Sequence, residues 1–128
     1  MFKILLIEDN IDFRQAFEDA LIDNLHVSVY GVENCTSGLK FVSSQLPNLA
    51  FIDINLPDGN GLDLAKTIKE LHPDIYIIIL SLVDSPEYVT AALDSGADHF
   101  ISKSAMNINE VVSLIEPMMT INKKRYLF

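Results

Sequence analysis

The chain has 128 residues, 49% hydrophobic and 21% charged, which is the size and composition of one globular domain. Its 18 acidic and 9 basic side chains give a net charge of −9, which disfavours binding to nucleic acid or to anionic membranes. One cysteine excludes an internal disulfide, and no apolar run is long enough for a membrane span or signal peptide, so we expect a cytoplasmic protein.

Five short apolar runs alternate along the chain with five stretches of helical spacing. The runs predict strands at 4–7, 27–32, 49–52, 75–80 and 99–101. Four of them are nearly continuous, which favours strands that are buried on both faces of a parallel sheet. The run at 27–32 alternates apolar and polar residues more regularly and is typical of an edge strand.

Helical spacing fills the segments that follow these strands. The apolar positions of the first three helices are Phe13, Ala16, Phe17, Ala20 and Leu21, then Cys35, Leu39, Val42 and Leu46, then Leu64, Ile68 and Leu71. Asn60 is a suitable N-cap for the third helix, Ser85-Pro86 opens the fourth, and Gly96 ends it. Asn107 is a suitable N-cap for the fifth helix, and Pro117 is expected to kink or end that helix.

This alternation predicts an α/β fold in which helices cover both faces of a five-stranded parallel sheet through right-handed crossovers. Such sheets bind their ligands beyond the carboxyl ends of the strands, at a topological switch point. The residues that end the predicted strands are therefore the candidates for a functional site.

Charged and hydroxyl side chains stand at the carboxyl ends of four predicted strands. They are Glu8 and Asp9 after the first strand, Asp53 after the third, Ser81 after the fourth and Lys103 after the fifth. Three carboxylates at one rim repel each other unless a cation lies among them, and all-oxygen ligands favour Mg²⁺ over zinc or copper. Mg²⁺ held by few carboxylates is typical of phosphate chemistry, for which a lysine supplies positive charge and a serine a hydrogen-bond donor.

Each of these residues taken alone has an ordinary structural explanation. A single aspartate or serine after a strand is most often a turn or cap residue, and a single lysine there is most often solvated. Their combination on four of five strands, all at the same end, favours a site.

Four segments resemble, in order and in spacing, the receiver domains of bacterial response regulators. The segments are 4–9 (ILLIED), 51–61 (FIDINLPDGNG), 80–81 (LS) and 96–103 (GADHFISK). The resemblance covers about residues 3 to 119 and implies a flavodoxin-like (βα)5 three-layer sandwich with strand order 2-1-3-4-5. It also implies a receiver domain at residues 1–121 and a tail or linker stub at 122–128.

The resemblance implies a role for each residue at this rim. Asp53 is the expected phosphoryl acceptor, Lys103 pairs with the phosphoryl group, and Ser81 contacts it. The expected Mg²⁺ ligands are Glu8 (largely through water), Asp9, Asp53 and the backbone carbonyl of Asn55. Ser81 and Phe100 are expected to form the conformational switch.

These roles describe a phosphoprotein of a two-component phosphorelay rather than an enzyme. The only reactions expected of it are self-catalysed phosphoryl acceptance and slow autodephosphorylation. A sensor histidine kinase or a phosphotransfer protein is the expected donor. The expected output surface is the face formed by the fourth helix, fifth strand and fifth helix, and phosphorylation is compatible with a homodimer. We expect this chain by itself to bind neither nucleic acid nor a membrane.

Four residues depart from the common receiver pattern, the first being Glu8, which replaces a more common aspartate, lengthening the reach but keeping the charge. Ser104 stands where many receivers have a proline, so Lys103 must be placed by other means. The segment 103–105 resembles receivers that precede LuxR-type DNA-binding domains. Leu82 is bulkier than the residue that often follows the serine, which favours slow phosphorylation, and Phe100 lacks the hydroxyl of a tyrosine.

Two other functions match parts of the pattern. A Mg²⁺-dependent phosphatase of the haloacid-dehalogenase type also uses an aspartate after an apolar strand, but it needs an acid/base aspartate where Asn55 stands. A degenerate receiver that serves only for docking or dimerisation does not need the intact set of site residues. The basic run at 123–125 is either a solvated tail or a linker to another domain.

Overall fold

The computed structural model describes the backbone of residues 1–127 and the side chains of residues 1–121. Its central sheet has five parallel strands in the order β2-β1-β3-β6-β7. These strands are β1 (Phe2–Ile7), β2 (Val27–Val32), β3 (Leu49–Asp53), β6 (Tyr76–Ser81) and β7 (His99–Ser102). Counted along the chain, the sheet strands have the order 2-1-3-4-5, which confirms the predicted flavodoxin-like topology.

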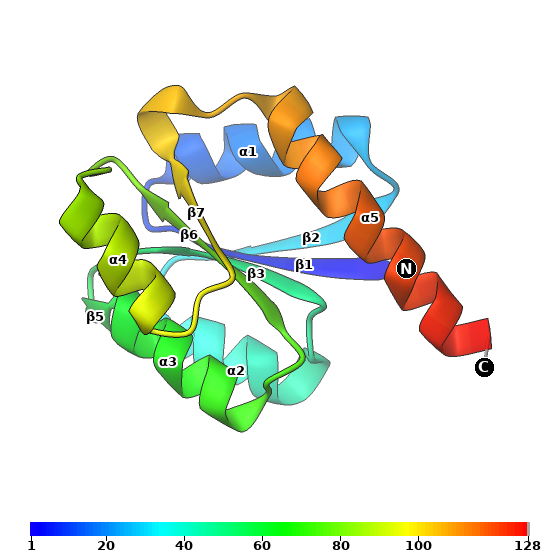
Figure 1. Cartoon of the computed structure of the whole chain (residues 1–128), viewed down its shortest axis with the longest axis horizontal. Helices are drawn as coiled ribbons and strands as arrows, with labels where there is room; N and C mark the ends of the chain where they lie inside the picture. The colour runs from blue at the N-terminus through cyan, green and yellow to red at the C-terminus, as the bar shows by residue number, and fades with distance from the viewer. Residues whose placement is uncertain (128) are drawn as a thin grey trace.

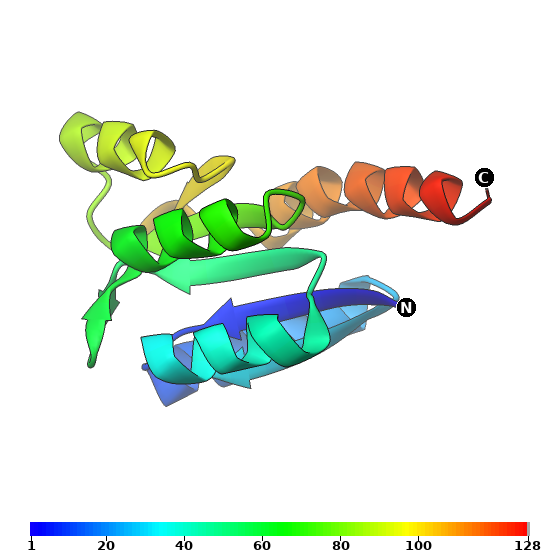
Figure 2. The same ribbon diagram turned by 90° about the horizontal axis from the view of Figure 1, so that it is seen from below.

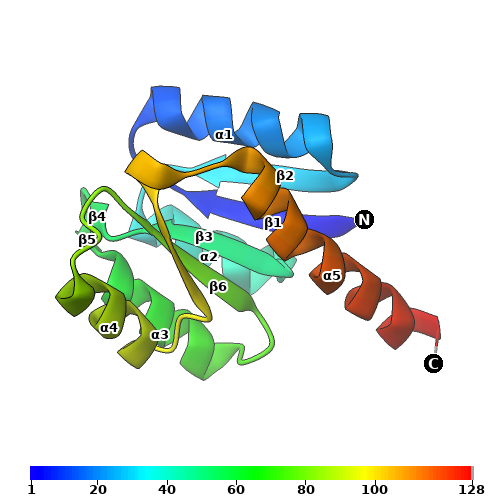
Figure 3. The same ribbon diagram turned by 45° about the horizontal axis from the view of Figure 1, so that its top comes forward.

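Five helices cover the two faces of this sheet. They are α1 (Ile11–Asn24), α2 (Cys35–Gln45), α3 (Gly61–Leu71), α4 (Pro86–Asp94) and α5 (Ile108–Leu127). Helices α1 and α5 lie on one face, and α2, α3 and α4 lie on the other, which gives three layers (Figures 1 and 3). Within the described part of the chain, no helix combines the length and apolar character that crossing a membrane requires.

The burial of each strand follows its place in the sheet. Every residue of β3, the central strand, is buried, and so is every residue of β6 after Tyr76. Strand β2 lies at an edge, and most of its residues are only half-buried or exposed. The prediction of an edge strand from the alternating run is therefore confirmed.

The hydrophobic core has one layer on each face of the sheet. On the α1/α5 face, Phe17 and Val111 pack among residues from the strands, and on the opposite face Val42, Leu64 and Ala92 do the same. Burial of one such aliphatic or aromatic side chain contributes about 1.5–3 kcal/mol. These two layers hold the carboxyl ends of the strands together at one edge, where Glu8, Asp53 and Lys103 lie.

Asparagine side chains cap four of the helices, including α5, where Asn107 Oδ1 accepts from the Asn109 N–H at 2.9 Å as predicted. Oδ1 of Asn10, Asn34 and Asn60 accepts a backbone N–H hydrogen bond at 3.0, 2.8 and 2.7 Å, respectively, at the starts of α1, α2 and α3. The predicted cap of α3 by Asn60 is confirmed. Ser85 stands at the predicted N-cap of α4, although its side chain makes no capping hydrogen bond. Gly96 follows the end of α4 as predicted, with a φ of +99° that favours glycine.

Pro117 was predicted to kink or end helix α5, and the helix does not end there. The helix contains Pro117 and continues to Leu127. Because Ser113 and Pro117 are both exposed, water can hydrate the Ser113 carbonyl that a proline leaves without a helical partner.

The final part of α5 extends past the amino-terminal edge of the sheet (Figure 2). The predicted boundary at residue 121 therefore falls within a helix. The side chains of the basic run at 123–125, and Phe128 itself, lie outside the described residues.

A short antiparallel hairpin between β3 and α3 has no counterpart in the predicted elements. It consists of β4 (Asn55–Leu56) and β5 (Gly59–Asn60). Its turn contains Pro57-Asp58, a pair that is typical of tight turns. The hairpin begins two residues after Asp53, so it borders the carboxyl edge of the sheet.

Candidate functional site

The polar residues predicted from the strand ends do meet at one edge of the sheet. Glu8 follows β1, Asp53 ends β3, Ser81 ends β6, and Lys103 follows β7 directly. Among the described residues, the buried polar or charged ones are Glu8, Asp53 and Ser81. Since burying such groups without partners is costly, their concentration at one edge marks the site.

Three carboxylates form a compact cluster at this edge. Glu8, Asp9 and Asp53 can each place one oxygen within 4.8 Å of the other two. Glu8 and Asp53 are buried, whereas Asp9 is exposed, so the cluster opens to solvent on the Asp9 side. Like charges this close raise the energy of the fully ionised cluster unless positive charge compensates them.

Lys103 supplies positive charge inside the site. Its Nζ lies 2.6 Å from Glu8 Oε2 and 3.1 Å from Asp53 Oδ2, and the lysine side chain is only 8% exposed. The same Nζ lies 4.7 Å from the centroid of the Phe13 ring. The ammonium therefore bridges two buried carboxylates and also faces an aromatic ring.

Backbone contacts on both sides anchor Glu8. Its N–H donates to the Val32 carbonyl at 3.0 Å, and its carbonyl accepts from Nη1 of Arg14 at 2.6 Å. Its Oε1 accepts from the Asn10 N–H at 3.1 Å. Burial raises the pKa of the Glu8 carboxyl above its usual value, and although Lys103 opposes this shift, the Asp53 charge adds to it.

The donor set of this cluster fits a hard divalent cation. Glu8 Oε2 is a buried oxygen whose partner among the described residues is the ammonium of Lys103, 2.6 Å away. Three carboxylates with no histidine or cysteine in the cluster match the oxygen ligands that Mg²⁺ prefers.

Gly61 lies directly behind Asp53. Its N–H donates to the Ile54 carbonyl at 2.6 Å, which draws the start of α3 against the end of β3. A Cβ at this position would collide with the carbonyl oxygen of Asp53. Only glycine allows this approach of the two backbones, so Gly61 sets the position of Asp53.

Asp58 fastens the β4–β5 hairpin to the start of α2. Its two carboxylate oxygens accept from the N–H groups of Cys35 and Thr36 at 2.7 and 3.0 Å, and from the Thr36 hydroxyl at 2.8 Å. These hydrogen bonds lower the pKa of Asp58 to about 2. The segment that follows Asp53 is therefore tied to a second helix.

Ser81 and Phe100, the predicted switch pair, lie on neighbouring strands. Ser81 Oγ accepts from the Val83 N–H at 3.0 Å, and its hydroxyl can still donate a hydrogen bond. In the sheet register Asp53 pairs with Leu80, so Ser81 stands one residue further towards the site. Phe100 is half-buried and packs against the core layer under α2, α3 and α4.

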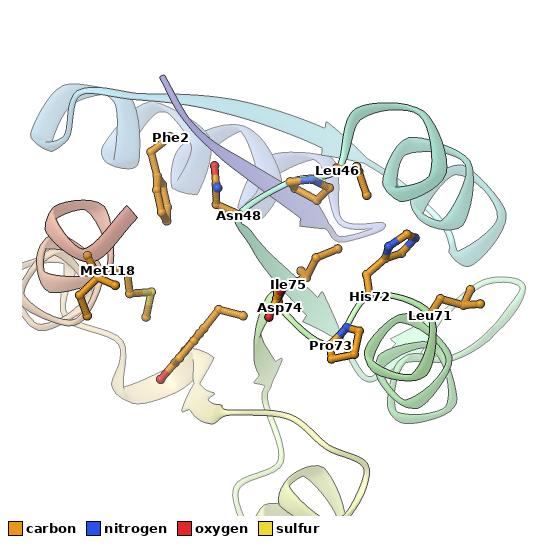
Figure 4. Close-up of a pocket in the computed structure, with 12 residues that line it drawn as sticks. Phe2, Leu46, Asn48, Leu71, His72, Pro73, Asp74, Ile75 and Met118 are labelled. Atoms are coloured by element: carbon orange, nitrogen blue, oxygen red, sulfur yellow. The ribbon is translucent and has the colours of Figure 1, made fainter. Parts of the chain in front are cut away.

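A hollow of about 670 Å³ lies at the opposite edge of the sheet from the carboxylate cluster. Phe2, Asn48, Ile75 and Met118 are among the residues that line it (Figure 4). It borders the starts of the strands rather than their ends, so it is separate from the carboxylate cluster.

Sequence reasoning missed two side chains that touch the site and one that anchors its border. Phe13 was expected only as part of an apolar helical stripe, and Arg14 was not singled out. Asp58 belongs to a Pro-Asp-Gly turn, which is a recognisable signal, but its partners lie 22 and 23 residues away in the sequence. The structure brings Asn55 to the start of β4 beside the site, where it is exposed.

The family model of the response regulator receiver domain matches residues 4–116 of the chain. Among curated proteins, the virulence transcriptional regulatory protein PhoP of Salmonella typhimurium is 27% identical over 122 residues, which are 95% of this chain and 54% of PhoP. The sensory transduction protein BceR of Halalkalibacterium halodurans is 35% identical over 103 residues, 80% of this chain and 44% of BceR. The chain thus spans about half the length of these relatives.

Solved structures show the same fold. A CheY-like response regulator receiver domain protein from Methanospirillum hungatei superposes with a TM-score of 0.87 at 25% sequence identity. The similarity covers 98% of each chain. It extends over the whole sheet and its helices rather than over one local segment.

Proposed function

The chain belongs to the family of response regulator receiver domains, which are signalling modules of two-component systems, and we propose that Asp53 is its phosphoryl acceptor. The observation that carries this proposal is the cluster at the carboxyl edge of the sheet, where Asp53 lies beside two further carboxylates and pairs with the ammonium of Lys103. The proposed donor is the phosphohistidine of a sensor histidine kinase or phosphotransfer protein.

In the proposed transfer, a carboxylate oxygen of Asp53 attacks the phosphorus atom of the donor. The new P–O bond gives an aspartyl phosphate as the P–N bond of the phosphohistidine breaks, and the electron pair of that bond stays on the histidine nitrogen. Lys103 pairs with a phosphoryl oxygen, and the Ser81 hydroxyl donates to another. Such transfers depend on positioning and on charge compensation, both of which these side chains provide.

Glu8, Asp9, Asp53 and the backbone carbonyl of Asn55 are the proposed holders of a Mg²⁺ ion. When bound, the ion neutralises negative charge on the phosphoryl oxygens during the transfer. The all-oxygen cluster supports this assignment, since Glu8 and Asp53 offer buried carboxylate oxygens and the exposed carboxylate of Asp9 opens the cluster to solvent.

The proposed switch couples the aspartyl phosphate to Phe100. Phosphorylation adds about 1.5–2 negative charges and strong acceptors at Asp53. Movement of Ser81 towards them opens space that the ring of Phe100 can enter. A hollow of about 400 Å³ on the β7/α5 surface, lined by Phe100 and Val111 among others, supports an output on the α4–β7–α5 face.

The output itself is also a proposal. PhoP is named as a transcriptional regulatory protein, and this chain matches about half of it. We therefore infer that the domain, bounded at about residue 121, regulates transcription through a further domain or a partner, in the cytoplasm. That this receiver precedes a LuxR-type DNA-binding domain, and that it forms a homodimer on phosphorylation, stay predictions. The comparisons give no support to the phosphatase alternative.

Mass spectrometry of the intact protein tests the acceptor. After incubation with Mg²⁺ and a small-molecule phosphodonor such as acetyl phosphate, the wild type should gain one phosphate, and the Asp53→Asn variant should gain none. Asp94→Asn, an exposed carboxylate at the end of α4, is the matched control and should be phosphorylated like the wild type. An equal adduct on Asp53→Asn, or none on the wild type, would contradict the proposal.

A further inference from the structure

We propose that Phe13 is a positioning residue for Lys103, and that the face of its ring holds the ammonium at the carboxylate cluster. The inference rests on the proposed function for its effect on phosphorylation. It starts from a contact between residues 90 positions apart, in which Lys103 Nζ lies 4.7 Å from the Phe13 ring centroid. This distance is within the range of a cation–π interaction.

The backbone around Lys103 leaves the direction of its long side chain to other contacts. Lys103 opens a 3-10 turn, Lys103–Ala105, and a hydrogen bond of 2.9 Å joins the hydroxyl groups of Ser102 and Ser104 across it. A lysine side chain has four rotatable bonds, so this turn does not determine where the ammonium lies. Side-chain contacts at Glu8, Asp53 and Phe13 do so.

The Phe13 ring is itself held in place by neighbouring aromatic rings. Its centroid lies 5.8 Å from that of Phe17, and the Phe17 centroid lies 5.0 Å from that of Phe51 in an edge-to-face arrangement. Phe51 is on β3, two residues before Asp53. The strand that carries the acceptor is thus connected through three rings to the contact that holds the lysine.

The cap of α1 fixes the backbone of Phe13 as well. Its N–H donates to Asn10 Oδ1 at 3.0 Å, in the same loop whose Asn10 N–H donates to Glu8 Oε1 at 3.1 Å. The loop that places the acidic residues therefore also places the ring. Phe13 is half-buried, so the ammonium that it faces is partly shielded from water, which strengthens a cation–π contact.

The ring contact differs from the two ion pairs because it does not depend on the carboxylates. A divalent cation at the cluster competes with Lys103 for Glu8 and Asp53, whereas a phosphoryl group competes with these two carboxylates for the ammonium, and in both cases the two ion pairs weaken. The attraction of the ammonium to the ring is unchanged by that competition. Phe13 therefore keeps Lys103 at the site while its carboxylate partners are taken by other groups.

The rate of phosphorylation by acetyl phosphate at saturating Mg²⁺ tests the consequence for function. Phe13→Leu should slow it about three- to thirty-fold, the range expected from losing one cation–π contact. Phe13→Tyr should keep the rate within about twofold of the wild type because it retains the ring. Phe13→Met is a second non-aromatic variant of similar volume, in case the leucine variant folds poorly.

Proton NMR of the lysine side chain gives a readout that a merely structural role does not change. The ε-methylene resonance of Lys103, assigned by its loss in Lys103→Met, should be shifted upfield by the ring in the wild type and in Phe13→Tyr, with and without Mg²⁺. It should return to the usual position in Phe13→Leu. Phe41→Leu, a half-buried aromatic on α2, is the matched control and should change neither the rate nor this resonance.

An unshifted Lys103 resonance in the wild type, or a wild-type rate in Phe13→Leu and Phe13→Met, would overturn the proposal. The two proposals also fail in different ways. If the wild type takes up no phosphate, the proposed function fails, whereas the resonance still decides whether Phe13 holds Lys103.

Discussion

At the scale of single residues, the site depends on a few buried charges that compensate one another. Glu8 is fully buried, and its carboxyl has a raised pKa because burial disfavours its charged form. The extra methylene of a glutamate lets Oε1 reach the Asn10 N–H while Oε2 reaches Lys103. The close packing around Asp53 also requires glycine at position 61, since a side chain there would collide with the Asp53 carbonyl.

The substitution Gly61→Ala should destabilise the protein and impair phosphorylation together. The added methyl group meets backbone atoms of Asp53 and Ile54, so the end of β3 must shift, at a cost of about 1–3 kcal/mol. Urea unfolding measures the loss of stability, and the phosphorylation rate reports the displacement of Asp53. Gly59→Ala, whose Cβ meets the Cys35 Sγ at 3.2 Å, is the milder control. Equal stability of the two variants would argue against this tight packing.

At the scale of elements, the segment after the acceptor strand is a small structure of its own. Strands β4 and β5 pair through Asn55 with Asn60 and Leu56 with Gly59, and the turn between them carries Asp58. Asp58 caps the exposed N–H groups at the start of α2, where a negative charge also interacts favourably with the helix dipole. Helix α2 therefore braces the loop that follows Asp53.

Asp58→Asn should be less stable than the wild type at neutral pH, and this difference in stability should shrink in acid. The carboxyl pKa falls from 3.8 to about 2 on folding, so the contribution of Asp58 is fully present above pH 3.8 and is lost as the pH falls through about 2. The difference in urea midpoint between wild type and variant should be constant from pH 7 to about pH 5 and shrink below pH 4.

Asp94→Asn serves as the control, since this exposed residue lies at the end of α4, away from the start of α2. A difference between the wild type and Asp58→Asn that does not change between pH 7 and pH 3 would contradict the role of the charge. Asp58→Asn should also be phosphorylated more slowly than the wild type, because the hairpin that Asp58 anchors carries Asn55.

At the scale of the whole molecule, folding places three carboxylates at one edge against their mutual repulsion. The net charge of −9 is spread over the chain, but folding brings Asp53 to the neighbouring Glu8 and Asp9, so that one oxygen of each lies within 4.8 Å of the other two. A cation that binds this cluster binds the folded state and not the unfolded chain. Its binding free energy therefore adds to the stability of the fold.

Mg²⁺ should raise the melting temperature of the protein. At ten times its Kd, one bound ion stabilises the fold by about 1.4 kcal/mol, which corresponds to a rise of about 3–6 °C for a domain of this size. Asp9→Asn should abolish the rise without disturbing the core because Asp9 is exposed. Asp23→Asn, an exposed residue near the end of α1, should keep it. A rise of equal size in Asp9→Asn would place the ion elsewhere.

Much of this molecule could be predicted from local patterns in the sequence. Short continuous apolar runs identified the buried strands, and the alternating run identified β2 as an edge, because the period of burial along a strand is a local property. Since the carboxyl ends of parallel strands meet at one edge, the proximity of Glu8, Asp9, Asp53 and Lys103 followed from the strand order alone.

Only the tertiary structure decided how these residues contact one another. The Phe13 ring over Lys103, the capping of α2 by Asp58 and the close approach of Gly61 to Asp53 depend on packing between separate elements. The continuation of α5 through Pro117 depends on solvent access to an exposed helix face. Sequence periodicity determines which face of an element is buried, whereas side-chain directions and distances are determined by the neighbours that folding brings beside it.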